Sequence, residues 1–149
     1  MSVALVSVAY KTVKRGPMNE VITANVTIDK GVENDILGRP SKRQVTVLSK
    51  QQWDKACAAI NADLSWLKRR ANLLISGHEF SAADVGKIIQ IGDDLRLLIT
   101  GETDPCRKME QSHPGLEEAL TPDWRGGVTC KVLHSGLIYP NDKIVISKY

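Results

Sequence analysis

Cysteine is scarce in this sequence, and no two cysteines stand at the spacing of a paired motif. The 149 residues contain three cysteines, Cys57, Cys106 and Cys130, and no CxxC. An odd and widely spaced set argues against a disulfide framework and against a structural zinc site. The cysteine content therefore favours a protein of the reducing cytosol.

Long apolar runs are also missing. No segment approaches the roughly 18 uninterrupted apolar residues of a membrane-spanning helix. The first residues, Met1–Val6, have no basic segment ahead of them and lead directly into a strand-like pattern. We therefore expect part of the fold here rather than a signal peptide. Together these features predict a cytoplasmic protein with no membrane partner.

Aromatic residues are few: one Phe, three Tyr and three Trp, with no basic stretch interleaved among them. Nucleic-acid binding through base stacking therefore receives little support. The net charge of +3 is mildly basic, and scattered Lys and Arg suit a localised anionic ligand such as a phosphate. There is no GxGxxG, no Walker loop and no catalytic Ser/His/Asp order. The isolated histidines His78, His113 and His134 are not expected to bind a metal.

What the sequence does contain is a series of short strand patterns between turns. A hydrophobic content of 42% and a charged content of 25% are typical of a soluble domain, and the length predicts a single domain over residues 1–149. The alternating or apolar runs predict strands over residues 3–14, 22–29, 45–48, 87–91, 95–99, 128–133, 137–139 and 143–147, and an apolar strand that ends at Gly77.

Helical patterns are fewer. One helix is expected after Ser49, which would form a capping box with Gln52, and its apolar face includes Trp53 and Cys57. Two shorter helical pieces are expected over residues 108–111 and 115–120. This combination predicts a mainly β fold, a barrel or twisted sheets with one main helix and short helical inserts.

The segment Gly101–Lys108 carries the most distinctive chemistry. It places Cys106 after two carboxylates and immediately before two cations. A thiol is a nucleophile or a metal ligand only as the thiolate, which neighbouring cations favour. Cys106 could therefore be reactive, or it could be a small buried hydrophobe. Cys57, on an apolar helix face, and Cys130, inside a strand, are expected to be structural.

Three other segments each allow two interpretations. Lys68–Arg70 could be a solvated edge or a clamp for an anion, because Arg presents a bidentate fork to phosphate. The irregular segment Gly31–Gln44 could be a functional loop or a solvated excursion. The glycines of Arg125–Gly127 could allow a backbone to approach a ligand closely, or could make a tight turn.

Taken in order, several segments resemble the MOSC domain, the module found at the C-terminus of molybdenum cofactor sulfurases and in standalone bacterial proteins. The resemblance extends from about Gly31 to the C-terminus. The matching segments are Gly31–Asp35, Arg43–Ser49, Arg70–Gly77, Ile91–Asp93, Thr103–Met109, Arg125–Val128 and Gly136–Asp142. Each is short, and their order and spacing carry the resemblance.

The resemblance implies a β-barrel with a site for the molybdenum cofactor (molybdopterin), a phosphate-bearing pterin dithiolene. The family's characteristic cysteine falls on Cys106, which would carry a sulfur as a persulfide or ligate molybdenum, since a soft thiolate suits a sulfur-ligated metal. Arg70 would pair with the cofactor phosphate, and Asn72 would hydrogen-bond the pterin or a loop backbone. The remaining implied cofactor-binding residues are Asp35, Lys42, Arg43, Arg125 and Gly126.

The chain also departs from its relatives. Many of them carry Gly-Asp-x-His in the early loop, whereas this chain has Leu37 at the His position, so no histidine is available there for proton transfer. No desulfurase, ferredoxin or flavin domain accompanies the module. A pyridoxal-phosphate-dependent desulfurase or a redox partner protein would have to supply sulfur or electrons.

Two functions follow from the resemblance. The protein could handle the cofactor or its sulfur through a reactive cysteine, as a sulfur carrier or as the molybdenum component of a reductase for N-hydroxylated compounds. The alternative is a non-enzymatic β-barrel module that binds another phosphorylated ligand.

Overall fold

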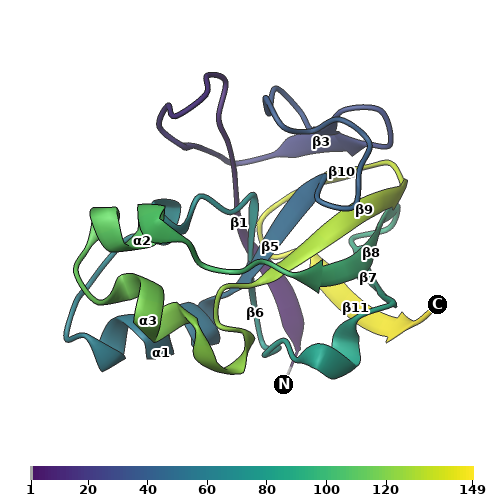
Figure 1. Ribbon diagram of the computed structural model, residues 1–149. Coiled ribbons are helices and arrows are strands. Elements are labelled where there is room, and N and C mark those ends of the chain that lie inside the picture. Colours follow the sequence, from purple (N-terminus) through teal and green to yellow (C-terminus); the bar gives the residue numbers. More distant parts are fainter. Residues whose placement is uncertain (1) are drawn as a thin grey trace.

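Seven strands close into a barrel at the centre of the molecule. The structure is a computed structural model that describes residues 2–149 (Figure 1). The barrel strands are β1 (Val3–Tyr10), β5 (Val45–Ser49), β6 (Leu73–Ser76), β7 (Lys87–Ile91), β8 (Leu95–Glu102), β9 (Val128–His134) and β11 (Lys143–Lys148). Their order is β11-β7-β8-β9-β5-β6-β1, and pairing between β1 and β11 closes the ring. β5 and β6 run parallel, and the other neighbours run antiparallel.

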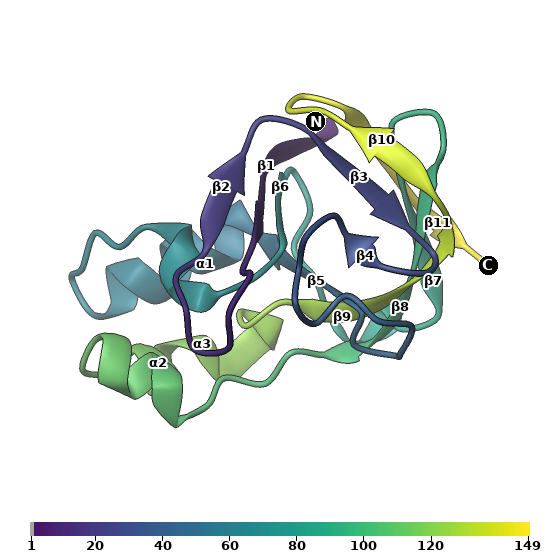
Figure 2. The same cartoon turned by 90° about the horizontal axis from the view of Figure 1, so that it is seen from above.

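A second, smaller sheet lies over one end of the barrel. Its order is β10 (Gly136–Ile138), β3 (Ala24–Thr27) and β4 (Gly31–Val32), and Figure 2 looks down on it. Val26, Val32 and Ile138 of this sheet are fully buried in one apolar cluster with residues from all seven barrel strands. The small sheet therefore acts as a lid on the barrel core. β2 (Asn19–Val21) pairs with the last residues of β1.

The strands next to the helices are buried on both faces. In β6, Leu73 and Ile75 belong to the barrel cluster, whereas Leu74 belongs to a second cluster under the helices. In β5, Val47 and Leu48 divide between the two clusters in the same way. This double burial explains the consecutive apolar residues Val47–Leu48 in β5 and Leu73–Ile75 in β6.

The helices form a layer against β1, β5 and β6. They are α1 (Lys50–Ala59), α2 (Arg107–Ser112), α3 (Leu116–Leu120) and the short 3₁₀ helices η1 (Trp66–Arg69) and η3 (Pro122–Trp124). A third 3₁₀ helix, η2 (Ala82–Asp84), lies apart from this layer and contacts β8. Trp53, Trp66, Met109 and Leu120 are buried in this layer. Because α2 contacts η1, the residues around Cys106 come close to the cations that end η1. Within residues 2–149, no helix is long and apolar enough to cross a lipid bilayer.

Most of the predicted elements are confirmed. They include the mainly β barrel, the hairpin over residues 87–99, the helix after Ser49 and the two helical pieces that follow Cys106. The strand predicted over 22–29 is wrong in extent, since β3 covers only Ala24–Thr27 and Ile22 is 79% exposed. Residues 19–21 pair with β1 and residues 24–26 with β10, so the chain passes from one sheet to the other at Ile22.

The predicted capping box is also wrong. Ser49 is the N-cap of α1, as expected, but its side chain makes no capping hydrogen bond. Gln52 is buried and bonds the backbone of Phe80 instead, accepting from Phe80 N at 3.0 Å and donating to Phe80 O at 2.9 Å. A tertiary contact therefore replaces the local cap.

Candidate functional site

Four of the predicted site residues line one small hollow beside the end of β1, which we call the inner hollow. Its lining includes the predicted residues Asp35, Arg43, Arg70 and Asn72. Lys11, Met18, Leu37, Gln44 and Thr46 complete it. The fold therefore brings together four predicted residues that are up to 37 positions apart in the sequence, from Asp35 in the early loop to Asn72 just before β6.

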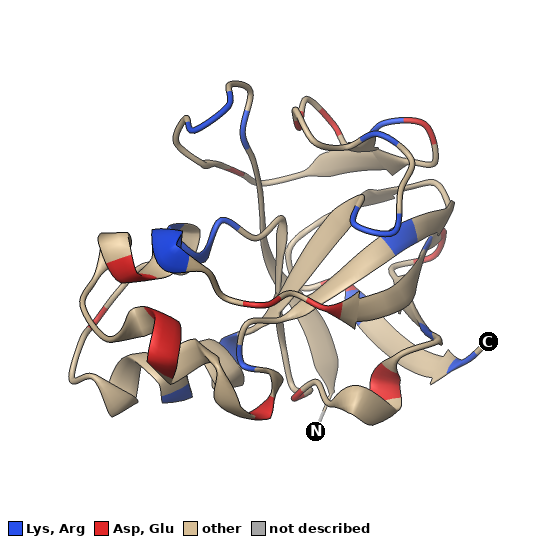
Figure 3. Cartoon of the chain, viewed as in Figure 1, with Lys and Arg blue, Asp and Glu red and all other residues tan. Residues whose placement is uncertain are grey.

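A larger hollow adjoins the first and shares Arg70 with it. This outer hollow has a volume of about 570 Å³ and is lined by Arg15, Arg70, Lys108, Gln111 and Ser112. These residues come from the β1–β2 connection, the end of η1 and helix α2. Figure 3 shows Lys and Arg in these segments and in the loop before β5, in the upper half of the view.

Four cations of the two hollows form no ion pair with another described residue, and Asp35 is the one carboxylate in the lining. No ion pair found within residues 2–149 includes Lys11, Arg15, Arg70 or Lys108. Burial and the charges of Arg70 and Lys108 lower the pKa of Lys11, and only the nearby Asp35 raises it. The cations in the lining outnumber this single carboxylate, and such an excess of positive charge makes a site for an anion.

Arg70 is held in an uncommon backbone conformation. It ends η1 with φ 66° and ψ 33°, in the left-handed region that residues other than glycine rarely adopt. Its Nη2 donates to the carbonyl of Gly16 at 2.5 Å. The turn thus directs this guanidinium toward the β1–β2 connection, where Arg15 lies.

The side chain of Asn72 forms hydrogen bonds within the wall of the barrel. Its Oδ1 accepts from Thr46 N at 3.0 Å, and its Nδ2 donates to Ala9 O at 3.2 Å. With only 6% of its surface exposed, the side chain ties β5 and β1 to the start of β6. Of the two roles that the resemblance implies, contact with a backbone is the one that these hydrogen bonds describe.

The early loop is anchored to the barrel rather than free in solvent. Gln44 is 1% exposed, donates to Ile28 O at 2.7 Å and accepts from Val132 N at 2.9 Å. Asp35 accepts from Lys11 N at 3.0 Å. Arg43 is exposed and lines the inner hollow, whereas the exposed Lys42 lines neither hollow and accepts a hydrogen bond from Thr100 through its carbonyl.

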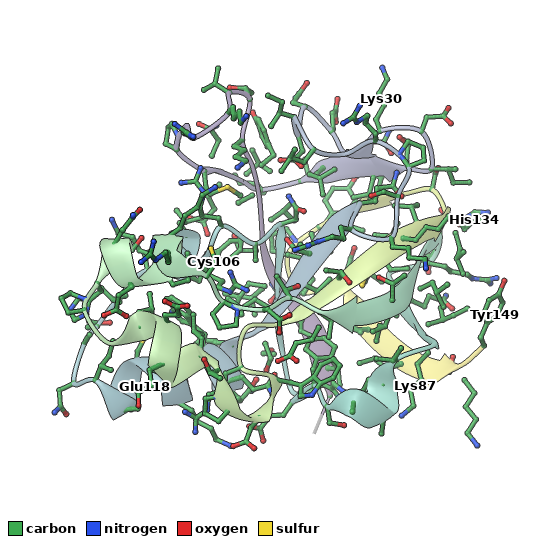
Figure 4. The ribbon with its side chains drawn as sticks, in the orientation of Figure 1. Lys30, Lys87, Cys106, Glu118, His134 and Tyr149 are labelled. Carbon is green, nitrogen blue, oxygen red and sulfur yellow. The ribbon has the colours of Figure 1, made fainter. Side chains whose placement is uncertain are left out.

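Cys106 is exposed, and it is the N-cap of α2 (Figure 4). The interpretation of Cys106 as a small buried hydrophobe is therefore wrong. Lys108, two residues further along, lines the outer hollow. Cys57 and Cys130 are buried as predicted, and burial raises the pKa of both thiols. The free thiol that solvent can reach is that of Cys106.

The Arg125–Gly127 loop is a tight turn against the protein's own chain. A Cβ at Gly126 would lie 2.4 Å from Thr103 O, and one at Gly127 would lie 2.4 Å from Val47 O. Arg125 donates through Nη1 to Ala119 O at 3.1 Å, at the end of α3, and lines neither hollow. The glycines therefore allow close packing of backbone on backbone.

Arg69 is the residue that the sequence interpretation missed. It is 7% exposed and donates through Nε to Gly126 O at 3.0 Å and through Nη2 to Thr103 O at 2.8 Å. The interpretation of Lys68–Arg70 as a solvated edge is wrong for Arg69, and the guanidinium bonds backbone carbonyls of the protein itself. Nothing in the local sequence distinguishes it from Lys68, which is exposed.

Comparison with known proteins identifies the relatives of this chain. A family model of the MOSC domain matches residues 21–145. The structure is similar to that of the YuaD protein from Bacillus subtilis, with a TM-score of 0.83 and 18% identity over 100% of this chain and 97% of that chain. It is also similar to YiiM from Geobacillus stearothermophilus (TM-score 0.66, 18% identity, covering 98% of this chain and 75% of that one). YiiM from Escherichia coli is a further neighbour (TM-score 0.72, 12% identity, 98% and 70%). At these identities the likeness concerns the fold, and no curated protein matches the sequence.

Proposed function

Because the chain belongs to the MOSC domain family, which is associated with the molybdenum cofactor, we propose that it binds this cofactor in the basic hollows beside Cys106. The observation that carries the proposal is that four cations line the two adjoining hollows, namely Lys11, Arg15, Arg70 and Lys108, and that no ion pair within residues 2–149 includes them. The exposed Cys106 lines neither hollow and lies two residues before Lys108 in the sequence. A phosphate would supply the counter-charge that these side chains lack.

The donor set fits the chemistry of this cofactor. A phosphate group calls for cations and N–H donors, which Arg70, Arg15 and Lys108 provide in the outer hollow. A sulfur-ligated metal calls for a soft, reachable ligand, and the exposed Cys106 is the thiol that meets this requirement.

Each residue would have a separate task. Arg70 would hold the phosphate, while Lys11 and Arg43 would add positive charge at the inner hollow. Asn72 would fix the wall behind them through its bonds to Thr46 and Ala9. Cys106 would bind molybdenum as the thiolate or carry a sulfur as a persulfide. When bound, the metal would supply redox and oxygen-transfer chemistry that no side chain of the chain can perform.

The test is to purify the protein from two otherwise identical strains, one able and one unable to make the pterin cofactor. Molybdenum is then measured by mass spectrometry, and pterin by the fluorescence of its oxidised form. We expect both to accompany the protein from the first strain only. Molybdenum at background in both would overturn the proposal, and a phosphorylated ligand without molybdenum would favour the non-enzymatic module.

Two substitutions with matched controls locate the site. Arg70→Ala should weaken cofactor binding by about 1.5–3 kcal/mol, the range for a hydrogen bond to a charged group. Lys68→Ala, which removes an exposed cation two positions earlier, should leave binding unchanged. Cys106→Ser should abolish molybdenum retention or persulfide labelling, and Cys57→Ser should not. Equal losses from both cysteine variants would show that Cys106 has no special role.

A further inference from the structure

A third hollow opens beside the inner hollow, at the loop that leads into β5, and we call it the loop hollow. It has a volume of about 620 Å³ and is lined by Leu37, Arg39, Pro40, Ser41, Arg43 and Thr46. Leu37, Arg43 and Thr46 also line the inner hollow, so the two hollows adjoin. A hollow of this size is large enough for a small organic molecule. The cofactor, placed in the inner and outer hollows, leaves this one unused.

The loop hollow carries positive charge and has no carboxylate in its lining. Arg39 and Arg43 are exposed, and in the described part of the chain no ion pair or hydrogen bond includes either guanidinium. Arg69, Arg70 and Arg125, by contrast, donate to backbone carbonyls of the protein itself. Two guanidinium groups that remain free beside one hollow suit an anionic ligand, because each presents paired N–H donors to a carboxylate or a phosphate.

Part of the lining of the loop hollow is apolar. Leu37 is 58% exposed, and Pro40 follows three residues later on the same loop. One exposed leucine is ordinary on a protein surface, but this one borders two hollows whose other groups are largely polar or cationic. A ligand that covers Leu37 removes apolar surface from water while its anionic end meets the guanidinium groups. The lining therefore favours an organic anion with an apolar body over a bare inorganic anion.

The loop that carries these groups is fixed to the rest of the fold. Gly38 packs so closely that a Cβ there would overlap the carbonyl oxygen of Lys30. The carbonyl of Gly38 accepts from Nε2 of the buried Gln44 at 3.0 Å. Because Leu37 and Arg39 flank Gly38, their backbone positions are set before a ligand arrives. A site that is already formed loses less conformational entropy when it binds.

We propose that the loop hollow binds an organic anion with an apolar body, of which an aromatic carboxylate is a simple example. Arg39 and Arg43 bind the anionic end, and Leu37 packs against the apolar body. Because this hollow adjoins the one assigned to the cofactor, the ligand represents the class of substrate on which the cofactor would act, and that part of the inference rests on the proposed function. The binding itself does not, since the chain supplies every group named here.

The test uses protein from cells unable to make the pterin, and it measures dissociation constants by NMR titration of the isotope-labelled chain. The probes are naphthoate, its neutral amide naphthamide, and acetate, which keeps the carboxylate but lacks the apolar body. The variants are Arg39→Gln and Leu37→Ala, both at exposed positions where the fold should tolerate the change. Lys30→Gln is a control that removes an exposed cation lining none of the three hollows. Arg15→Gln is a second control that removes a cation of the outer hollow.

We expect naphthoate to bind with a Kd of about 1 mM, as its size suggests, and about tenfold more tightly than naphthamide, while acetate shows no measurable binding. The chemical-shift changes should centre on residues 37–46. Arg39→Gln should weaken naphthoate binding about tenfold, because it removes a charged hydrogen-bond donor. Leu37→Ala should weaken it about threefold, because it removes apolar contact area. Both control variants should stay within about twofold of the wild type.

Equal affinities for naphthoate and naphthamide would overturn the inference, as would the absence of naphthoate binding. Equal losses from Arg39→Gln and Arg15→Gln would mean that the anion does not distinguish the loop hollow from the outer hollow, and acetate binding as tight as that of naphthoate would mean that the apolar body is irrelevant; either result would overturn it. Naphthoate binding by a protein that never acquires molybdenum would support the binding site and refute the proposed function. Molybdenum in a protein that does not bind naphthoate would do the reverse.

Discussion

Gly126→Ala tests whether the turn before β9 serves the protein's own packing or the approach of a ligand. The new methyl group would lie 2.4 Å from Thr103 O, closer than real Cβ atoms come to a backbone oxygen. It would also press on Arg69, which donates to both Gly126 and Thr103. The backbone must therefore move apart at the point where Arg69 holds it.

The expected cost follows from this overlap. Inserting a methyl group into a packed site typically costs about 1–3 kcal/mol. For a chain of this size the melting temperature should fall by roughly 2–12 °C. Gly101→Ala is the matched control, because its Cβ would meet its nearest neighbour, Thr129 Oγ1, at an ordinary 3.6 Å. That variant should melt within about 1–2 °C of the wild type.

The assay is thermal unfolding of the cofactor-free protein, followed by circular dichroism, together with alkylation of Cys106. We expect Gly126→Ala to melt earlier and to show an altered alkylation rate, since Thr103 starts the connection that leads to Cys106. An unchanged melting temperature combined with weaker cofactor binding would refute this reasoning. It would mean that the glycine accommodates a ligand instead.

Two further predictions concern charge. Lys11→Gln should raise the melting temperature by roughly 1–3 °C at pH 7 and low salt, because it relieves repulsion from Arg70 and Lys108, and the gain should disappear in high salt. The pKa of Lys11 is lowered in the folded state, so between that pKa and 10.5 the unfolded chain binds more protons than the folded one. The wild type should therefore gain stability relative to the variant as the pH rises through this window. A melting temperature of Lys11→Gln below that of the wild type at pH 7 would contradict this account. Asp84→Asn should cost about 1–3 kcal/mol in urea unfolding at pH 7, since the carboxylate accepts from His78, Ser81 N and Lys87. Burial raises the pKa of Asp84, but these hydrogen bonds lower it by more, so the folded-state pKa lies below 3.8. The stabilisation should therefore be present above pH 3.8 and lost as the pH falls through the folded-state pKa. A difference in stability between the two proteins that does not change down to pH 2 would contradict the assignment.

The parts of the fold that the sequence predicted are those governed by local pattern. The hairpin over residues 87–99 and the helix after Ser49 follow from periodicity and turn residues within one segment. The strand over residues 22–29 was wrong in extent because only its middle, Ala24–Thr27, pairs with the small sheet, while the residues just before it, Asn19–Val21, pair with β1. Only the tertiary arrangement decides that Ile22 lies at the crossing point.

The residues of the candidate site also divide into those that local sequence indicates and those that only the tertiary structure brings into place. Cys106 could be singled out because a thiol beside cations is visible in the sequence, and Arg70 because the resemblance to the MOSC domain separates it from the neighbouring Lys68 and Arg69. Arg69 could not, since its burial depends on carbonyls 34 and 57 positions away. Lys11 and Arg15 were also missed, because a strand end and a turn explain them locally, and only the closed barrel brings them to Arg70.

The closure of the barrel has a consequence for how the molecule fluctuates. β1 meets β11 in two residue pairs, Val3 with Ile144 and Ala4 with Lys143, helped by two backbone bonds of Leu5, whereas β8 and β9 share six pairs. Breathing motions should begin at this short seam. Lys11 lies eight residues after Val3, roughly 26 Å away along an extended strand. The barrel can therefore open between β1 and β11 at the start of β1, while the cations at the end of β1 keep their arrangement.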